Sequence, residues 1–358
     1  MQYFHNDYNE ICHPAILKKM QDNMGNQMGG YGEDTACESA AKLIREACGN
    51  DKLAVHFLVG GTQANLIVIS ASLRPHQAAL GADTAHINVH ETGAIEATGH
   101  KVIALPTTDG KINGTQIRET MQSHYADAAH EHTPLPKLVY ISNPTELGTI
   151  YSLSELEEIS TACKDHGLYL FVDGARLGYG LAAKGNDVTF ADLARLTDVF
   201  YIGGTKVGAL FGEAVVISNP AIAEDFRYII KQRGAMLAKG WLLGLQYEAL
   251  FEDGLYLKIA AHADAMADKI RQTLSNLNYP LLVEGVTNQI FPILPDSLLD
   301  KLKDHFTFSE QQRVDQTHRA VRFCTSWATK SDAVDALCAA LKNFSGLSFI
   351  HNTVIMLL

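Results

Sequence analysis

The sequence lacks the features that mark membrane, secreted and nucleic-acid-binding proteins. No apolar run reaches the roughly 20 residues that a membrane-spanning helix needs, and residues 1–7 show no charged-then-apolar leader. Basic residues are too few and too scattered to follow a phosphate backbone, because 29 Lys and Arg stand against 40 Asp and Glu, a formal net charge of −11. We therefore expect a cytoplasmic protein that binds neither a membrane nor a nucleic acid.

Cysteine is scarce, and its spacing shows no pattern. The six cysteines form no C-x-x-C pair and no metal-like arrangement, so we expect reduced, buried side chains, with a catalytic thiol as the alternative. The polar cluster His124, His130, Glu131 and His132 lacks the H-E-x-x-H spacing that places two ligands on one helical face. It indicates a solvated loop, and the sequence predicts no metal site.

Short apolar runs alternate with amphipathic stretches from about residue 53, which is typical of a mostly parallel sheet covered by helices. Several runs are apolar at every position, as strands buried on both faces are. The six runs span residues 53–58, 101–105, 138–141, 168–172, 199–202 and 214–217. The sequence therefore predicts an α/β fold.

The length of the chain predicts two domains, because 358 residues exceed the size at which single cores usually stop growing. Beyond about residue 250 the elements become shorter, with apolar runs at 288–294 and 320–324 and a helix at 331–344. We expect a large domain over residues 1–250 that includes an N-terminal arm, and a small α/β domain over 251–345. A tail over 346–358 is too short to span a bilayer.

Two apolar runs end in residues that suit one cofactor. The run at 168–172 is followed by Asp173 and then Arg176, and the run at 199–202 is followed by glycines on both sides of Lys206. The separation, 206 − 173 = 33 residues, fits a strand, a helix and the next strand, so both side chains can reach one cleft. Pyridoxal phosphate needs both groups: a lysine that bonds its aldehyde and a carboxylate that keeps its ring nitrogen protonated. A solvated lysine and a helix-capping aspartate are the alternatives.

Two further segments gain meaning beside that pair. Gly60, Gly61 and Thr62 follow an apolar run and open a helix, where free amides and a hydroxyl can hold an anion. They lack the spacing of nucleotide-binding loops, so a single phosphate or a simple tight turn are the two interpretations. His86, with Glu91 nearby, could stack on a cofactor ring, and a satisfied core histidine is its alternative.

Taken in order, these motifs resemble the threonine aldolase and β-eliminating lyase family of pyridoxal-phosphate enzymes. The resemblance implies fold type I: a large domain with a mostly parallel seven-stranded sheet, a small C-terminal α/β domain and pyridoxal 5′-phosphate as cofactor. It covers residues 4–342 and rests on residues 4–8, 31–34, 60–65, 85–88, 172–176, 204–206 and 321–323.

The resemblance also implies a role for each matching residue. Gly60, Gly61 and Thr62 hold the phosphate, with Lys239 as a further contact. His86 stacks on the ring, Asp173 meets the pyridine nitrogen and Lys206 bonds the cofactor. The substrate carboxylate is bound by Arg176 and Arg322, whose planar guanidinium groups suit it, together with Asn6. Arg176 also contacts the cofactor.

The activity implied is cleavage of L-threonine, L-allo-threonine or a related β-hydroxy-α-amino acid to glycine and an aldehyde, with His86 or a water that it orders as the base. A turn in which many threonine aldolases have a histidine reads Asn143-Pro144-Thr145-Glu146 here, which leaves the base and the stereopreference open. The alternatives are β-elimination, transamination, a phenylserine-type aldolase, or a sensor of the cofactor or of amino acids. The resemblance further implies a homodimer or homotetramer in which Tyr31 serves the neighbouring subunit.

Overall fold

A seven-stranded sheet forms the centre of the larger part of the molecule, in the order β2-β8-β7-β6-β5-β3-β4. β8 runs antiparallel to both of its neighbours and the other neighbouring pairs are parallel, so the predicted mostly parallel sheet is confirmed. The strands are β2 (Ala54–Leu58), β3 (Gln77–Ala82), β4 (Val102–Leu105), β5 (Leu135–Ser142), β6 (Tyr169–Asp173), β7 (Val199–Gly203) and β8 (Glu213–Ile217). A computed structural model describes the backbone of residues 1–355 and the side chains of residues 1–344.

Six of these strands coincide with the six predicted apolar runs, and β3 was not predicted. Its sequence, Gln-Ala-Ala-Leu-Gly-Ala, holds none of the β-branched or aromatic residues that mark strands. All six of its residues are nevertheless buried, between β4 and β5. The position inside the sheet, rather than local preference, makes this segment a strand.

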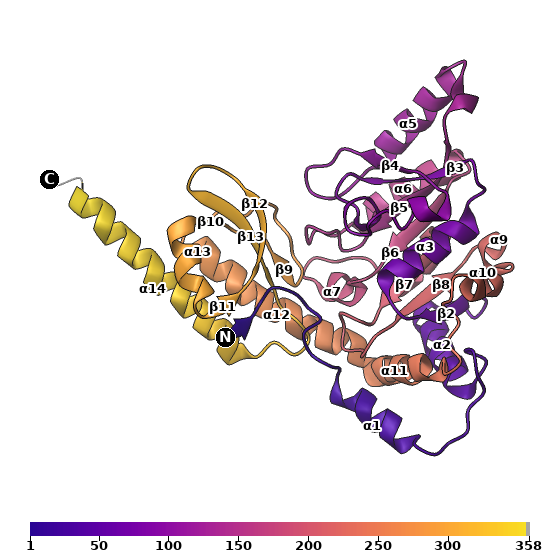
Figure 1. Ribbon diagram of the computed structural model, residues 1–358, viewed down its shortest axis with the longest axis horizontal. Coiled ribbons are helices and arrows are strands. Elements are labelled where there is room, and N and C mark those ends of the chain that lie inside the picture. Colours follow the sequence, from indigo (N-terminus) through magenta and orange to yellow (C-terminus); the bar gives the residue numbers. More distant parts are fainter. Residues whose placement is uncertain (356–358) are drawn as a thin grey trace.

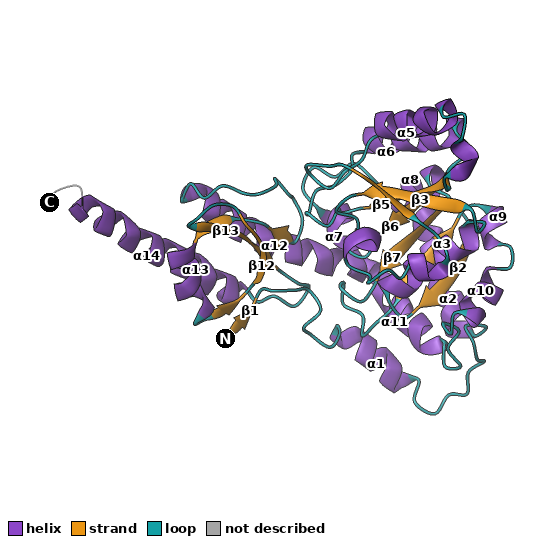
Figure 2. Ribbon diagram, turned by 45° about the horizontal axis from the view of Figure 1, so that its top comes forward, coloured by secondary structure: helices purple, strands orange, loops and turns teal. Residues whose placement is uncertain are grey.

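Helices cover the two faces of the sheet, as Figures 1 and 2 show. The predicted capping box at Ser152 opens α6, and Gly167 follows that helix with a positive φ of 63°, so both predicted signals are confirmed. The helices of this part are α1 (Pro14–Asp22), α2 (Thr35–Cys48), α3 (Gly61–Ser72), α4 (His86–Val89), α5 (Gly114–Ala126), α6 (Leu153–Asp165), α7 (Leu177–Ala182), α8 (Phe190–Leu196), α9 (Pro220–Ala223), α10 (Phe226–Gln232) and α11 (Trp241–Phe251), with short 3-10 turns at Glu96–Thr98, His130–His132 and Glu252–Gly254.

The smaller part contains a short antiparallel sheet beside three helices (Figure 1). β13 pairs with β10, β12 and β9, and the N-terminal strand β1 joins this part by pairing with β11. The elements are β1 (Gln2–Tyr3), β9 (Gln289–Ile290), β10 (Ile293–Pro295), β11 (Phe306–Thr307), β12 (Ser309–Arg313), β13 (His318–Cys324), α12 (Leu255–Asn276), α13 (Asp296–Lys303) and α14 (Ser331–Ile355).

Two buried apolar clusters meet within α12. The cluster of the large sheet reaches Ala263, and the second cluster begins at Met266 and includes Phe4 from the N-terminal arm. The predicted division near residue 250 stays a prediction. α14 continues past residue 344, where the sequence predicted its end, while the last residues of the predicted tail, 356–358, lie outside the described residues.

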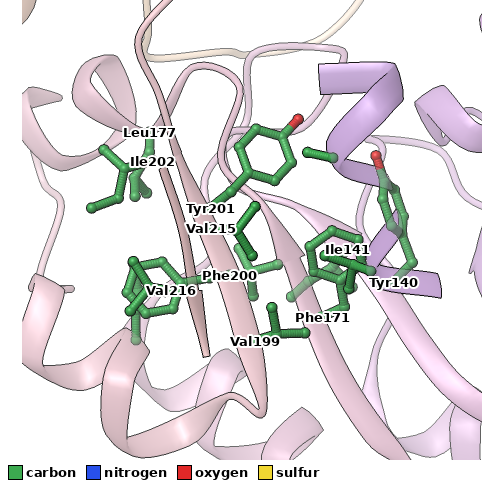
Figure 3. Packing of buried hydrophobic residues seen from close by; sticks show 14 of the residues in the cluster. Tyr140, Ile141, Phe171, Leu177, Val199, Phe200, Tyr201, Ile202, Val215 and Val216 are labelled. Carbon is green, nitrogen blue, oxygen red and sulfur yellow. The ribbon is translucent and has the colours of Figure 1, made fainter. Parts of the chain in front are cut away.

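The core around β5, β6, β7 and β8 is one continuous cluster of buried apolar side chains (Figure 3). Phe171, Val199, Phe200 and Val215 are each 0% exposed, as expected of strands covered by helices on both faces. The six cysteines are buried and free, as predicted, and burial raises the pKa of Cys48 to about 12. No helix among the described residues has the length and apolar character needed to cross a membrane.

Candidate active site

A cavity of about 520 Å³ opens at the edge of the sheet where β2, β5, β6 and β7 end. Ligands of open α/β sheets bind at this edge because the loops that leave the strands converge there. Eight of the predicted site residues line the cavity: Gly60, Gly61, Thr62, His86, Asp173, Arg176, Lys206 and Arg322. Asn6, Lys239 and Tyr31 are not among the lining residues.

Asp173 ends β6 and is 3% exposed. Its Oδ1 accepts hydrogen bonds from the hydroxyl of Tyr201 at 2.5 Å and from the backbone N–H of Ala175 at 2.9 Å. Its Oδ2 accepts from the hydroxyl of Tyr140 and from Nδ2 of Asn65, the latter at 3.2 Å. Four donors thus converge on this one carboxylate and fix its orientation at the floor of the cavity.

Tyr140 and Tyr201 stand on the strands that flank β6, and Figure 3 shows both rings among the buried side chains of the sheet. Burial, together with the charge of Asp173, raises the pKa of both phenols well above the usual value. Each hydroxyl therefore keeps its hydrogen and donates it to the carboxylate.

His86 begins α4, and its Nδ1 lies 2.7 Å from Oε1 of the buried Glu91. Because a carboxylate can only accept, Nδ1 carries the hydrogen of this bond. The same oxygen accepts from Nδ2 of Asn65 at 2.7 Å, which links the pair to Asp173. Burial opposes protonation, but the hydrogen bond to Glu91 and the charges of Glu146 and Asp173 raise the pKa of His86.

Lys206 lies half-buried in the turn between β7 and β8. The turn is tied by Gly204 and Thr205, whose backbone N–H groups both donate to the carbonyl of Gly212. Glu213 lines the same cavity and accepts from the Thr205 hydroxyl at 2.9 Å and from the Gly204 N–H at 3.2 Å. Burial raises the pKa of Glu213 to about 8, against the opposing effects of Thr205 and Lys206.

The start of α3 offers donors that the protein itself does not use. Gly60 caps the helix without a side-chain hydrogen bond, and the first amides of a helix have no partner within it. Among the described residues, none accepts from the N–H groups of Gly61 and Thr62 or from the Thr62 hydroxyl. A Cβ on Gly61 would lie 3.2 Å from the hydroxyl of Tyr201, so glycine keeps this approach open.

The two predicted substrate arginines differ in their surroundings. Arg176 is 6% exposed, and its Nε and Nη2 donate to the two oxygens of Asp7 at 2.7 and 3.0 Å. Asp7 also accepts from Nδ2 of Asn288 at 2.9 Å. Burial opposes the charge of Asp7, but Arg176 and then Lys206 hold the pKa of this carboxyl below its usual value.

Arg322 keeps donors free. Its Nη2 donates to the carbonyl of His5 at 2.8 Å, while its Nε is buried without a partner in the described part of the chain. This guanidinium is therefore better able than that of Arg176 to bind a carboxylate in the cavity.

The remaining predicted residues lie elsewhere. Asn6 is buried, and its Oδ1 accepts from the backbone N–H of Tyr8, which lines the cavity. Tyr31 is 47% exposed, with its N–H donating to the carbonyl of Ala238, next to the exposed Lys239. Tyr31 and Lys239 thus stand together, outside the cavity of their own chain.

Sequence reasoning did not single out several residues of the site. Tyr140 and Tyr201 could have been found, because a tyrosine inside a continuous apolar run needs a partner for its hydroxyl. Glu213 directly precedes the apolar run 214–217, which is the same kind of signal. No local sequence signal reveals the contacts of Asp7 and Asn65, because the residues to which they bond are far away in the sequence.

Solved structures with the same architecture define the class. The chain superposes on a threonine aldolase from Leishmania major with a TM-score of 0.94 and 45% identity, covering 96% of this chain and all of that one. An aspartate aminotransferase from Thermus thermophilus, 13% identical, gives a TM-score of 0.70 over 96% of this chain and 90% of that one. The protein therefore has the fold of the fold-type I enzymes, as predicted.

The sequence narrows this class to a family. A family model described as β-eliminating lyase matches residues 12–296, and a low-specificity L-threonine aldolase from a Pseudomonas species is 31% identical over 95% of this chain and 97% of its own length. The chain belongs to the β-eliminating lyase family. The resemblance drawn from the motifs is thereby confirmed.

Proposed function

We propose that this protein is a pyridoxal-phosphate-dependent carbon–carbon lyase. It cleaves L-threonine, L-allo-threonine and related β-hydroxy-α-amino acids to glycine and an aldehyde. The observation that carries the proposal is the cavity in which Lys206 and the four-donor carboxylate of Asp173 stand together. The similarity to proteins named threonine aldolases supports the choice of substrate.

The residues of the cavity fit pyridoxal phosphate. Asp173, oriented by its donors, suits a protonated ring nitrogen, and Lys206 has no hydrogen-bonding partner for its amine among the described residues. The unused amides at the start of α3, with Gly61 and Thr62, suit a phosphate dianion. When bound, the cofactor supplies an aldehyde for the lysine and a ring that withdraws electrons from the substrate Cα.

Each side chain then has one task. Lys206 would bind the aldehyde of the cofactor, the group that the substrate amine also needs. Asp173 would hold a proton on the ring nitrogen, and His86, oriented by Glu91, would stack on the ring. Arg322 binds the substrate carboxylate and so orients the Cα–Cβ bond for cleavage. Arg176 lines the same cavity while bound to Asp7, and Asn6 supports the lining residue Tyr8 through its backbone N–H.

We propose a homodimer or homotetramer as the working form. Tyr31 and Lys239 are exposed and adjacent, yet both lie away from the cavity of their own chain. In an oligomer they would complete the cavity of a neighbour, with Lys239 near its phosphate. Light scattering would give the oligomeric state. Mixing Lys206→Ala with Tyr31→Ala protein should then restore part of the activity, and no restoration would count against shared sites.

The first test is aldehyde release. Purified protein loaded with pyridoxal phosphate is given L-threonine, acetaldehyde is followed with a coupled alcohol dehydrogenase, and glycine is measured separately. We expect equal amounts of both products and complete loss in Lys206→Ala, which also loses the borohydride-reducible bond to the cofactor.

Other products would redirect the proposal. Ammonia and a keto acid would indicate a β-eliminating reaction, and transfer of the amino group to a keto acid would indicate an aminotransferase. Benzaldehyde from phenylserine without acetaldehyde from threonine would move the substrate to bulkier side chains. A bound cofactor with no turnover of any of these compounds would favour a sensor.

A further inference from the structure

Glu146 stands in the turn that follows β5, at the same edge of the sheet as Asp173. The turn is held firmly: the Asn143 N–H donates to the carbonyl of Asp173 at 2.9 Å, and the Gly148 N–H donates to the carbonyl of Thr145 at 3.0 Å. The hydroxyls of Thr145 and Thr149 lie 2.6 Å apart. Glu146 is therefore a half-buried cavity residue on a well-supported turn.

The carboxylate of Glu146 is not committed to any other interaction. It has neither a hydrogen bond nor an ion pair among residues whose side chains the structure describes. Burial opposes the charges of His86 and Arg176, but the charge of Glu146 contributes to the raised pKa of His86 and, after the larger effect of Asp7, to the raised pKa of Arg176. A carboxylate that lines a cavity and bonds to no other described side chain can accept a proton from a ligand.

Several other polar groups of the site already take part in hydrogen bonds. Nδ1 of His86 carries the hydrogen of its bond to Glu91, so only Nε2 of this ring can accept another proton. Tyr140 and Tyr201 already donate to Asp173. Glu213 accepts from Thr205 and from a backbone amide. His90 is exposed, at a ring distance of 5.5 Å from His86, and remains the competitor to test.

We propose that Glu146 is the catalytic base that removes the proton from the substrate β-hydroxyl, an inference that rests on the proposed function. As Glu146 takes the proton, the hydroxyl oxygen becomes the aldehyde oxygen and the Cα–Cβ bond breaks, with its electron pair drawn toward the bound cofactor. Cα gains one proton when glycine forms, so the proton lost by the hydroxyl balances the proton gained and no further reactant is needed.

The test compares two reactions of the loaded enzyme in Glu146→Gln. Cleavage of L-threonine requires removal of the hydroxyl proton, whereas exchange of the glycine α-proton for deuterium, followed by NMR, requires the same cofactor and the same carboxylate contact but involves no hydroxyl. We expect threonine cleavage to fall by about 100-fold or more and glycine exchange to stay within a fewfold of the wild-type rate. The affinity of the cofactor-free variant for pyridoxal phosphate, measured by titration of the visible band, should not change.

Glu119→Gln is the matched control, because it makes the same chemical change on an exposed position of α5. Several results would overturn the assignment: unchanged threonine cleavage in Glu146→Gln, a parallel loss of cleavage and glycine exchange, or weakened cofactor binding that accounts for the loss. If threonine cleavage is retained in Glu146→Gln but lost in His90→Asn, the catalytic base is His90. A wild-type protein that exchanges glycine but releases no aldehyde would reject the proposed function, and with it this role.

Discussion

At the scale of single residues, the two arginines of the cavity show how the same side chain takes different roles. Both were predicted to bind the substrate carboxylate. Arg176, however, forms a two-point pair with the fully buried Asp7, while Arg322 keeps a buried Nε without a partner in the described residues. We expect this pair to stabilise the fold, because removing the arginine would leave a buried carboxylate without its hydrogen-bonded cation, which is strongly destabilising.

Replacing each arginine by glutamine should separate these roles. Arg322→Gln should raise KM for L-threonine about 10- to 100-fold, because a hydrogen bond to a charged group is lost, while the free energy of unfolding changes little. Arg176→Gln should lower the free energy of unfolding by about 3–5 kcal/mol. Steady-state kinetics and chemical denaturation of the cofactor-free proteins measure both. A raised KM without a loss of stability in Arg176→Gln would restore its predicted role as a direct substrate contact.

At the scale of elements, the close contact between α2 and α11 explains why position 244 is a glycine. α11 crosses α2 at Gly244, where an added Cβ would lie 2.5 Å from the backbone nitrogen of Cys37 and 2.7 Å from the carbonyl carbon of Ala36. Such distances leave no room for a methyl group unless the helix backbones separate. The crossing supports the large sheet from outside, because α11 also packs on β2.

Gly244→Ala is therefore expected to destabilise the protein although alanine is the better helix former. The loss from separating the helices should be at least about 2 kcal/mol, larger than the gain of under about 1 kcal/mol from helix preference. Ser39→Ala, which removes the 2.7 Å hydrogen bond to Glu248 across the same helix pair, should cost about 1 kcal/mol. Thermal unfolding would rank the three proteins, and a Gly244→Ala protein as stable as the wild type would show that the helices can part freely.

At the scale of the whole molecule, α12 connects the two buried clusters, and an acidic residue lies at their meeting point. Asp264 is 5% exposed, between Ala263 of one cluster and Met266 of the other. Neither of its oxygens has a hydrogen-bonding partner in the described part of the chain. Burial raises the pKa of Asp264 to about 9, although Arg271 opposes the shift.

This carboxyl should make stability fall as pH rises. The folded protein retains a proton that the unfolded chain, with an aspartate pKa of about 3.9, has already released. Stability therefore decreases between about pH 4 and pH 9, and Asp264→Asn removes that decrease. We expect a variant that matches the wild type near pH 4 but is more stable by at least about 1 kcal/mol at pH 8. Chemical denaturation at several pH values measures this difference. If the free energies of unfolding of the two proteins change with pH in the same way, the raised pKa of Asp264 is contradicted.

Much of the site could be predicted because its chemistry is local in sequence. Lys206 and Asp173 each follow an apolar run, and parallel strands bring such positions to one edge. Partners that come from distant segments could not be predicted. Nothing near Asp7 in the sequence indicates Arg176, 169 residues away, and the alanines of β3 prefer no strand on their own.

The sequence by itself determined the α/β class, the family, and the pair of Lys206 and Asp173, because residue type, spacing and apolar pattern carry those properties without reference to distant contacts. The tertiary structure alone decided that the N-terminal arm pairs with β11, that Arg176 is held by Asp7, and that Glu146 lines the same cavity as His86 without a partner in the described residues. The physical reason is that the availability of a charged group depends on which distant side chains fold against it, and only the assembled chain determines those contacts.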